Sequence, residues 1–231
     1  LHRRRHSFPT RRSSDLGLQG SGETLGPGKV YATLKHLAGH GQPEGGINVG
    51  PAPIAERYEA ATDMLAALHR EALPDSLPLT AEFTYDIPVF DVDAWLVEIG
   101  LMIEWYLPSR GVTLRKDQRD AFFAMWHDLL QKPEAAPRTW VMRDFHSPNL
   151  IWLGERTGIL RVGIIDFQDA VLGPAAYDLV SLLQDARIDV PEPLELALLT
   201  RYIKARRASD ERFDPAGFAE LYAIMSAQRN T

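Results

Sequence analysis

Three polar residues in the C-terminal half of the chain have the spacing that a phosphoryl-transfer site requires. Asp144 follows an apolar run that begins at Trp140, Asn149 comes five residues later, and Asp166 ends a second apolar run. Phosphoryl transfer needs a carboxylate that accepts the proton of the attacking hydroxyl. It also needs an amide and a second carboxylate that hold Mg²⁺ on the phosphates of ATP. We therefore predict Asp144 as the catalytic base and Asn149 and Asp166 as the Mg²⁺ ligands.

Further polar residues near these three are candidates for substrate binding. Small-molecule sites combine a few placed polar and charged groups with apolar and aromatic side chains. The candidates are Arg143, His146, Glu98, Asp185 and Arg187. Two of them have an equal alternative, because His146 could support the loop backbone and Arg143 could form a salt bridge within the domain. Charges on a helix surface are commonly only solvated, which is the alternative for the other three.

Composition excludes several classes of protein. The chain has 231 residues, 45% of them hydrophobic, and contains no cysteine, which excludes disulfides and thiolate metal sites. The net charge is −6 although five arginines crowd into the first 16 residues, so the remainder is strongly acidic. We expect neither nucleic acid nor a membrane as partner. We expect a cytoplasmic monomer.

The N-terminal 50 residues look unlike the rest of the chain. Residues 1–16 contain Ser7-Phe-Pro-Thr-Arg-Arg-Ser-Ser-Asp-Leu16, which is the translation of a string that resembles a common sequencing adapter. We hypothesise that residues 1–16 are not native. Residues 17–50 are rich in glycine and read as a flexible linker or a remnant of a lobe.

Periodic apolar residues from residue 51 onward predict a mostly helical domain. We expect helices at about 54–68, 91–106, 117–131, 174–183 and 194–206, and from Pro215 with no stop before Thr231. Asp91 should cap the second helix, and Pro108 should stop it. The third should bury Phe122, Met125, Trp126 and Leu129. Strands are expected at 140–142, 150–153 and 159–165.

Three motifs together carry a family resemblance. From about residue 51 to 231 the chain resembles the large lobe of the aminoglycoside phosphotransferase and choline-kinase-like superfamily. The motifs are R-D-F-H-S-P-N-L-I-W, G-I-I-D-F-Q-D-A and G-P-A-A-Y-D-L-V-S-L-L-Q-D-A-R. Within the superfamily they are most similar to bacterial cell-wall amino-sugar kinases. Those enzymes phosphorylate N-acetylmuramate and N-acetylglucosamine at the anomeric hydroxyl in peptidoglycan recycling.

The resemblance implies the fold and the reaction. It implies an α+β, protein-kinase-like fold, mostly the helical C-terminal lobe, with a β-hairpin that carries the catalytic loop. It implies ATP, Mg²⁺ and a small sugar acceptor as partners, with Asp144 as base and Asn149 and Asp166 on the metal. Asp178 would brace the catalytic loop rather than bind metal. An aminoglycoside or choline acceptor is the alternative.

The resemblance also implies that parts of the enzyme are missing. No lysine suited to the nucleotide phosphates can be placed, since Lys29 and Lys35 are the only lysines before the helices and neither lies in a convincing strand. We therefore expect the N-terminal lobe to be largely missing, and the chain to be truncated at its C-terminal end. We expect little or no ATP turnover from this chain alone. A non-catalytic domain or pseudokinase is the alternative from another class.

Overall fold

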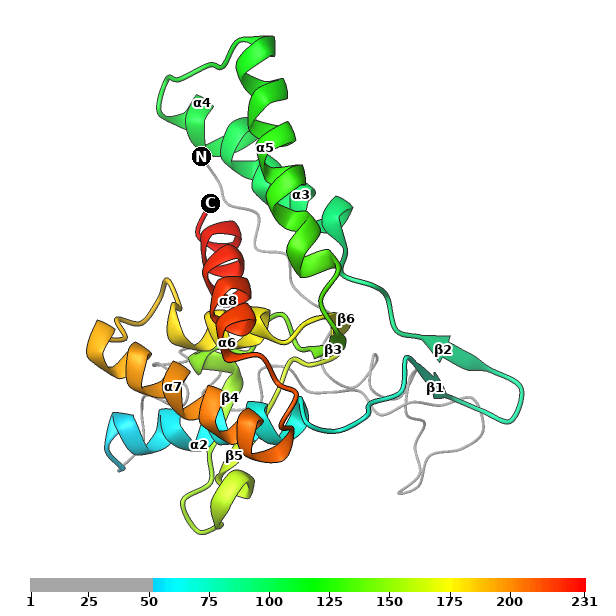
Figure 1. The fold of residues 1–231 in the computed structure, drawn as a ribbon, viewed down its shortest axis with the longest axis vertical. Coiled ribbons are helices and arrows are strands. Elements are labelled where there is room, and N and C mark those ends of the chain that lie inside the picture. Colours follow the sequence, from blue (N-terminus) through cyan, green and yellow to red (C-terminus); the bar gives the residue numbers. More distant parts are fainter. Residues whose placement is uncertain (1–51) are drawn as a thin grey trace, which may run out of the picture. The chain divides into compact units, whose positions relative to one another are not determined.

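Helices dominate residues 52–231, which are the part of the chain that the computed structural model describes (Figure 1). The α-helices are α2 (Ile54–Leu68), α3 (Val92–Leu101), α4 (Leu107–Ser109), α5 (Lys116–Glu134), α6 (Ala176–Leu183), α7 (Glu192–Ser209) and α8 (Pro215–Arg229). A π-helical turn covers Met102–Tyr106, and 3-10 turns cover Ser147–Asn149 and Gly158–Arg161. The strands are β1 (Ser76–Pro78), β2 (Thr84–Asp86), β3 (Arg138–Val141), β4 (Leu150–Trp152), β5 (Val162–Ile164) and β6 (Val171–Pro174). The predictions for residues 1–16 and 17–50, with Lys29 and Lys35, lie outside the described residues.

The strands pair in antiparallel twos. β1 pairs with β2, β3 with β6, and β4 with β5. The β4–β5 hairpin was predicted, and its register sets Leu150 opposite Ile164. Because Ile165 N–H then donates to Asn149 O at 3.0 Å, the hairpin brings Asn149 and Asp166 to the same end.

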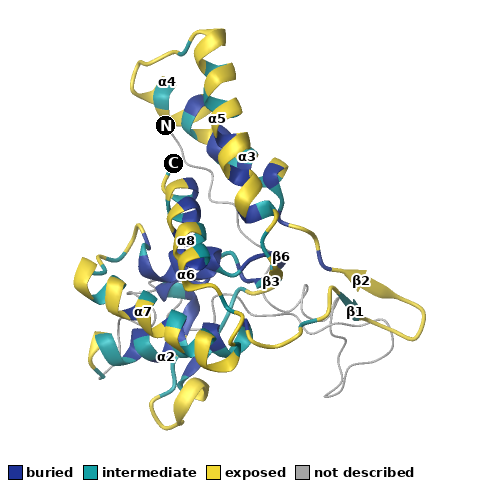
Figure 2. Cartoon of the chain, in the orientation of Figure 1, coloured by how far each residue is buried: buried dark blue, intermediate teal, exposed yellow. Residues whose placement is uncertain are grey.

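The core lies where α2, α6, α7 and α8 meet. α6 is buried along its whole length, and α8 packs beside it (Figure 2). On α2 the predicted apolar stripe is confirmed, since Tyr58, Ala61 and Leu65 are fully buried. At the outer end of that stripe Ile54 is exposed. Burial of this shared core is the main stabilising contribution to the lobe that carries the site.

The second predicted helix begins as expected and ends differently. Asp91 Oδ1 accepts from Ala94 N–H at 3.0 Å, so the predicted N-cap is confirmed. The predicted stop at Pro108 is wrong, because the helical backbone continues through the π-turn to Ser109. A π-turn shifts the following residues around the helix axis. Tyr106, which follows Met102 at a helical spacing of four, is accordingly exposed.

The third helix buries a different face from the predicted one. Met125 and Leu129 are exposed, whereas Trp126 and Leu130 are buried. The spacing of four between the two buried residues is still helical. The apolar positions alone allow two adjacent stripes, and contacts made by α5 select the one that includes Leu130.

Three further element predictions are corrected. Gly173 and Pro174 do not open a helix, since they end β6, and α6 begins at Ala176. The expected strand at 159–165 is a 3-10 turn as far as Arg161 and a strand only over Val162–Ile164. At the C-terminus α8 ends at Arg229 rather than continuing to Thr231.

Candidate active site

Asp144 lies on a sharply turned loop between β3 and the 3-10 turn. Its backbone N–H donates to Met142 O at 2.7 Å, and its own carbonyl accepts from Asn149 Nδ2 at 3.0 Å. Arg143 has a φ of 62°, in the left-handed region that few residues other than glycine adopt. This turn leaves the side chain of Asp144 53% exposed, so its carboxylate is accessible to a substrate.

Asp178 fixes the backbone of this loop from below. It is fully buried, and its two carboxylate oxygens accept from Met142 N–H at 2.7 Å and from Arg143 N–H at 3.1 Å. Burial raises the pKa of Asp178 to about 7, against the opposing effect of these two backbone donors. Ser181 Oγ adds a hydrogen bond to Arg143 O at 3.2 Å. These contacts support the bracing role that we predict for Asp178.

Asn149 and Asp166 offer oxygen atoms of the kind that Mg²⁺ prefers. Asn149 Nδ2 is committed to Asp144 O, so the amide is oriented with its Oδ1 as the remaining acceptor. Asp166 also has a φ of 62°, and its Oδ1 accepts from Gln168 Nε2 at 2.6 Å. Within residues 52–231 no three His, Cys, Asp or Glu side chains gather into a metal site. The donor set therefore fits Mg²⁺ held by one amide and one carboxylate, completed by phosphate and water oxygens.

His146 lies behind Asp144. Its ring is buried, and its Nε2 is 3.7 Å from Asp144 Oδ1. Burial lowers the pKa of His146, and the charge of Arg187 lowers it further. The imidazole is therefore neutral at pH 7. His146 does not line the pocket in front of Asp144, and its Nδ1 is buried without a hydrogen-bond partner among the described residues.

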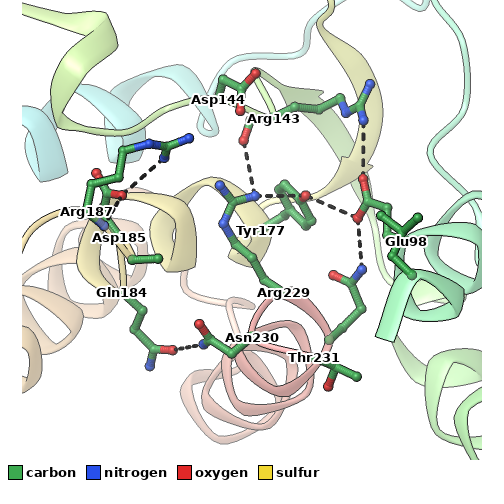
Figure 3. A pocket seen from close by; sticks show the side chains of 13 residues that line it. Glu98, Arg143, Asp144, Tyr177, Gln184, Asp185, Arg187, Arg229, Asn230 and Thr231 are labelled. Carbon is green, nitrogen blue, oxygen red and sulfur yellow. Dashed lines mark hydrogen bonds and ion pairs between the residues drawn. The ribbon is translucent and has the colours of Figure 1, made fainter. Parts of the chain in front are cut away.

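A pocket of about 440 Å³ opens in front of Asp144 (Figure 3). It brings together five of the predicted residues, Glu98, Arg143, Asp144, Asp185 and Arg187. In Figure 3 Asp185 and Arg187 lie on one side, Glu98 lies on the other, and Asp144 lies between them. Asn149, Asp166, His146 and Asp178 are not among its described lining residues.

Glu98 is occupied by the protein itself. Its Oε1 accepts from Arg143 Nη2 at 3.2 Å, while its Oε2 accepts from Tyr177 Oη at 3.4 Å and from Gln228 Nε2 at 2.9 Å. Arg143 also stacks over the ring of Phe90, 5.2 Å from its centroid. Both residues thus form part of the pocket wall. The salt bridge that we give as the alternative for Arg143 is present.

Asp185 is the predicted carboxylate with capacity left for a ligand. Its side chain is almost fully buried, and its Oδ1 accepts from Arg187 N–H at 3.0 Å and Arg187 Nη1 at 3.3 Å. Its Oδ2 is buried and has no hydrogen-bond partner among the described residues. A buried acceptor without a donor is costly, which favours a ligand that supplies an O–H or N–H here.

Sequence reasoning missed Arg229 and its neighbour Gln228. Arg229 Nη1 donates to Tyr177 Oη at 2.9 Å and to Arg143 O at 3.5 Å, and the guanidinium lies over the Tyr177 ring. Burial raises the pKa of Tyr177 to about 12, so it remains a neutral phenol. The signal was available, because positions three and four after Met225 continue the apolar face of the last helix.

The protein family that matches this chain agrees with the arrangement of the site residues. The profile of the phosphotransferase enzyme family matches residues 15–221 of the chain. The chain belongs to this family. The match begins within residues 1–16 and spans all of residues 17–50, so the predicted absence of an N-terminal lobe is not confirmed.

The chain is similar to curated proteins named N-acetylmuramate/N-acetylglucosamine kinase, of which three follow. The protein of Caulobacter vibrioides is 37% identical over 170 residues, which are 74% of this chain and 47% of that protein. The protein of Neisseria meningitidis serogroup B is 39% identical over 149 residues, or 62% and 42% of the two chains. The protein of Pseudomonas aeruginosa is 31% identical over 183 residues, or 78% and 50%. The chain thus spans about half the length of these relatives.

The chain also resembles a solved structure of aminoglycoside phosphotransferase APH(2'')-Ib with ADP. The TM-score is 0.42 and the identity 20%, over 75% of this chain and 66% of the other. These three curated relatives carry kinase names, so the alternative of a non-catalytic domain gains no support.

Among the described helices none has the length and apolar character needed to cross a bilayer.

Proposed function

We propose that this chain forms the catalytic and acceptor-binding part of an ATP-dependent kinase of N-acetylated amino sugars. The observation that carries the proposal is one pocket that holds both an accessible carboxylate, Asp144, and a buried carboxylate oxygen in need of a donor, on Asp185. The names of the relatives agree with it. The cytoplasmic location and the monomeric state remain expectations.

In the proposed reaction Asp144 accepts the proton of the sugar hydroxyl as that oxygen attacks the γ-phosphorus of ATP. The bond to the β–γ bridging oxygen breaks, and ADP leaves. Met142 and Asp178 hold the loop so that the Asp144 carboxylate keeps one position, which is the main contribution a protein makes to this chemistry. Asn149 and Asp166 would hold Mg²⁺, whose charge neutralises the phosphate oxygens when it is bound.

The charges around the pocket favour a neutral or anionic acceptor over a cationic one. Its described lining contains Glu98, Asp144 and Asp185, but these are matched by Arg143, Arg187 and Arg229. An aminoglycoside or choline carries positive charge, and the three guanidinium groups here would offset its attraction to the three carboxylates. An N-acetyl sugar carries hydroxyl and amide N–H donors, which suit the free oxygen of Asp185.

Arg229 is the residue we propose for recognition of the carboxylate of N-acetylmuramate. Arg143 is paired with Glu98 and Arg187 with Asp185. Within the described chain Arg229 has only neutral acceptors, Tyr177 Oη and Arg143 O. A guanidinium without an acid partner is suited to bind a carboxylate of the substrate. N-acetylglucosamine lacks that carboxylate and would not use this contact.

The test is a phosphorylation screen with the complete gene product that contains this chain. N-acetylmuramate and N-acetylglucosamine should be phosphorylated with ATP and Mg²⁺, and kanamycin and choline should not. Asp144→Asn should lower kcat by roughly 100- to 10,000-fold, as removal of a general base does. Turnover of Asp144→Asn at the wild-type rate, or a preference for kanamycin, would overturn the proposal.

Arg229→Gln tests the acceptor assignment separately. It should raise KM for N-acetylmuramate by roughly 10-fold or more, since a charge-assisted hydrogen bond is lost. KM for N-acetylglucosamine should change little. Lys204→Gln serves as a matched control, because Lys204 is exposed on α7 and does not line the pocket. Equal effects of Arg229→Gln on both sugars would refute the carboxylate contact and leave the kinase assignment intact.

A further inference from the structure

A second pocket of about 650 Å³ lies at the opposite end of α8 from the proposed active site. Its described lining comes from the C-terminal part of α7, the start of α8, and the segment that connects α5 to β3. It shares no described lining residue with the pocket in front of Asp144. None of the chemistry proposed above uses it.

His69 presents a buried donor to this second pocket. It is nearly fully buried, and its Nδ1 lies 2.8 Å from Tyr202 Oη. Tyr202 is fully buried too, and His69 is the hydrogen-bond partner that its hydroxyl has among the described residues. We assign the Tyr202 hydroxyl as the donor to Nδ1, because it has no other acceptor there, and this assignment puts the imidazole proton on Nε2. Burial lowers the pKa of His69 to about 3, so the ring is neutral at pH 7.

The Nε2–H of His69 has no acceptor within residues 52–231, and neither do two donors of Arg206. Arg206 Nε and Nη1 are buried and unpaired. Arg206 has no ion pair with any described carboxylate, and its guanidinium lies 5.6 Å from the centroid of the Phe213 ring. It lies close enough to lower the pKa of His69. Two side chains therefore offer three N–H donors and one positive charge without an acceptor.

Each acid that lines the same pocket has a hydrogen-bond or ion-pair partner other than Arg206. Asp210 accepts from Arg212 N–H at 2.9 Å, and Asp214 accepts from Ala216 N–H at the start of α8. Glu220 pairs with Lys132. None of these three acids pairs with Arg206 at ion-pair distance, although the guanidinium is close enough to lower the pKa of Asp210. A water molecule could accept one of the three hydrogen bonds but would leave Arg206 without an ion-pair partner.

Apart from Arg138 and Thr139, much of the remaining wall is apolar and partly flat. Tyr202 and Phe218 are stacked with centroids 4.8 Å apart and an interplanar angle of 22°. The ring of Phe213 lies beside that of Phe218, with the two ring centroids 5.4 Å apart. Ala135, Pro137 and Ala176 contribute further apolar surface. Such walls suit a flat apolar body with a single polar end, which is the usual composition of a small-molecule site.

We propose that this pocket binds a small organic anion, with the anionic oxygens on Arg206 and His69 and an aromatic or other flat apolar body against Tyr202, Phe213 and Phe218. The anion can be a carboxylate or a phosphate monoester, because either accepts from a guanidinium and an imidazole N–H. This pocket is separate from the proposed kinase site. The proposal of an anion site therefore does not depend on the proposed function.

Calorimetric titration of the chain with three probes tests the site. Benzoate and phenyl phosphate represent the two kinds of anion, and benzyl alcohol has the same ring without charge. At least one anion should bind saturably in a one-to-one ratio, and benzyl alcohol should not. Arg206→Gln should weaken that binding by roughly 10- to 100-fold, as loss of charge-assisted hydrogen bonds does. Lys204→Gln, on the exposed side of the same helix, should leave it unchanged.

Binding at the other pocket must be distinguished, because it also contains arginines. An anion whose affinity falls in Arg229→Gln but not in Arg206→Gln has bound beside Asp144, and that result overturns the proposal. Failure of both anions to bind the wild-type chain at millimolar concentration overturns it as well. If Arg206→Gln does not fold, the ¹⁵N signals of the His69 ring in the wild-type chain decide. They should move on titration with the bound anion, and unchanged signals would contradict the assignment.

Discussion

Replacing Asp178 by Asn should change both the stability of the chain and the pH dependence of that stability. The Asp178 carboxylate accepts two backbone hydrogen bonds, from Met142 and from Arg143. An amide has one acceptor oxygen, so one of the two N–H groups would face the NH₂ of Asn and lose its bond. A buried unsatisfied donor costs about 1–3 kcal/mol. Asp178→Asn should therefore lower the free energy of unfolding.

The pH dependence follows from the raised pKa of Asp178. Burial raises it to about 7 in the folded state, whereas an unfolded Asp titrates near ~3.9. A raised folded-state pKa means that protonated Asp178 stabilises the fold below about pH 4. That stability is lost progressively as the pH rises through about 7. Between pH 5 and pH 8 the loss amounts to roughly 2–3 kcal/mol. Asn cannot titrate, so the difference in stability between wild type and Asp178→Asn should narrow as the pH rises.

Urea unfolding of the chain, followed by tryptophan fluorescence from pH 5 to pH 8, measures this difference. Ser181→Ala is the matched control, because it removes another contact of the same loop, the hydrogen bond to Arg143 O. It should cost about 1 kcal/mol at every pH. A difference for Asp178→Asn that widens with rising pH would refute the reasoning. Such a result would mean that the two backbone donors outweigh burial and keep the carboxylate ionised.

Three further predictions concern other parts of the lobe. Asp166→Asn should leave thermal stability nearly unchanged, because Asn tolerates the left-handed backbone at this position. It should also lower kcat of the complete enzyme by roughly 100-fold or more, because a charged metal ligand is lost; unimpaired kcat would remove Asp166 from the metal site. Asp91→Ala should destabilise the chain by about 1 kcal/mol in urea unfolding through loss of the α3 cap, and no measurable change would argue against that cap. Leu130→Ala should cost about 2–5 kcal/mol and Met125→Ala less than about 0.5 kcal/mol; the reverse order would show that α5 buries the other face.

Local patterns were enough to predict the elements whose determinants lie close together in sequence. The stripe on α2 repeats within 15 residues, and the Asp91 cap depends on a contact three residues away. The β4–β5 hairpin is closed by a short connection. In contrast, β6 has its partner 30 residues earlier, where Val171 lies opposite Val141. No local pattern encodes that pairing, so Gly173 and Pro174 were assigned to a helix.

The same distinction holds in the site. Asp144, Asn149 and Asp166 could be found from their spacing, because one loop and one hairpin position all three. Arg229 lies 86 positions after Arg143 in the sequence. Only the packing of α8 against α6 brings the two residues together at the pocket. The commitment of Glu98 to Tyr177 and Gln228 is equally non-local. Residue type and spacing therefore predicted the proposed catalytic and metal-binding groups and several pocket residues, while Arg229 and the internal contacts of Glu98 required the fold.

Backbone strain is the remaining feature of the site that spacing did not reveal. Arg143 and Asp166 both have a φ of 62°, which costs each of them on the order of 1–3 kcal/mol when the residue is not glycine. Glycine would remove that cost but would also remove the side chains, one of which forms part of the pocket wall and the other of which is the proposed metal ligand. The strain is held in place by neighbouring contacts, which for Arg143 are the bonds to Asp178 and Ser181. The two strained positions lie next to Asp144 and next to the Asn149 end of the β4–β5 hairpin. The turns that orient the proposed reactive groups are therefore the turns that contacts with the rest of the lobe stabilise.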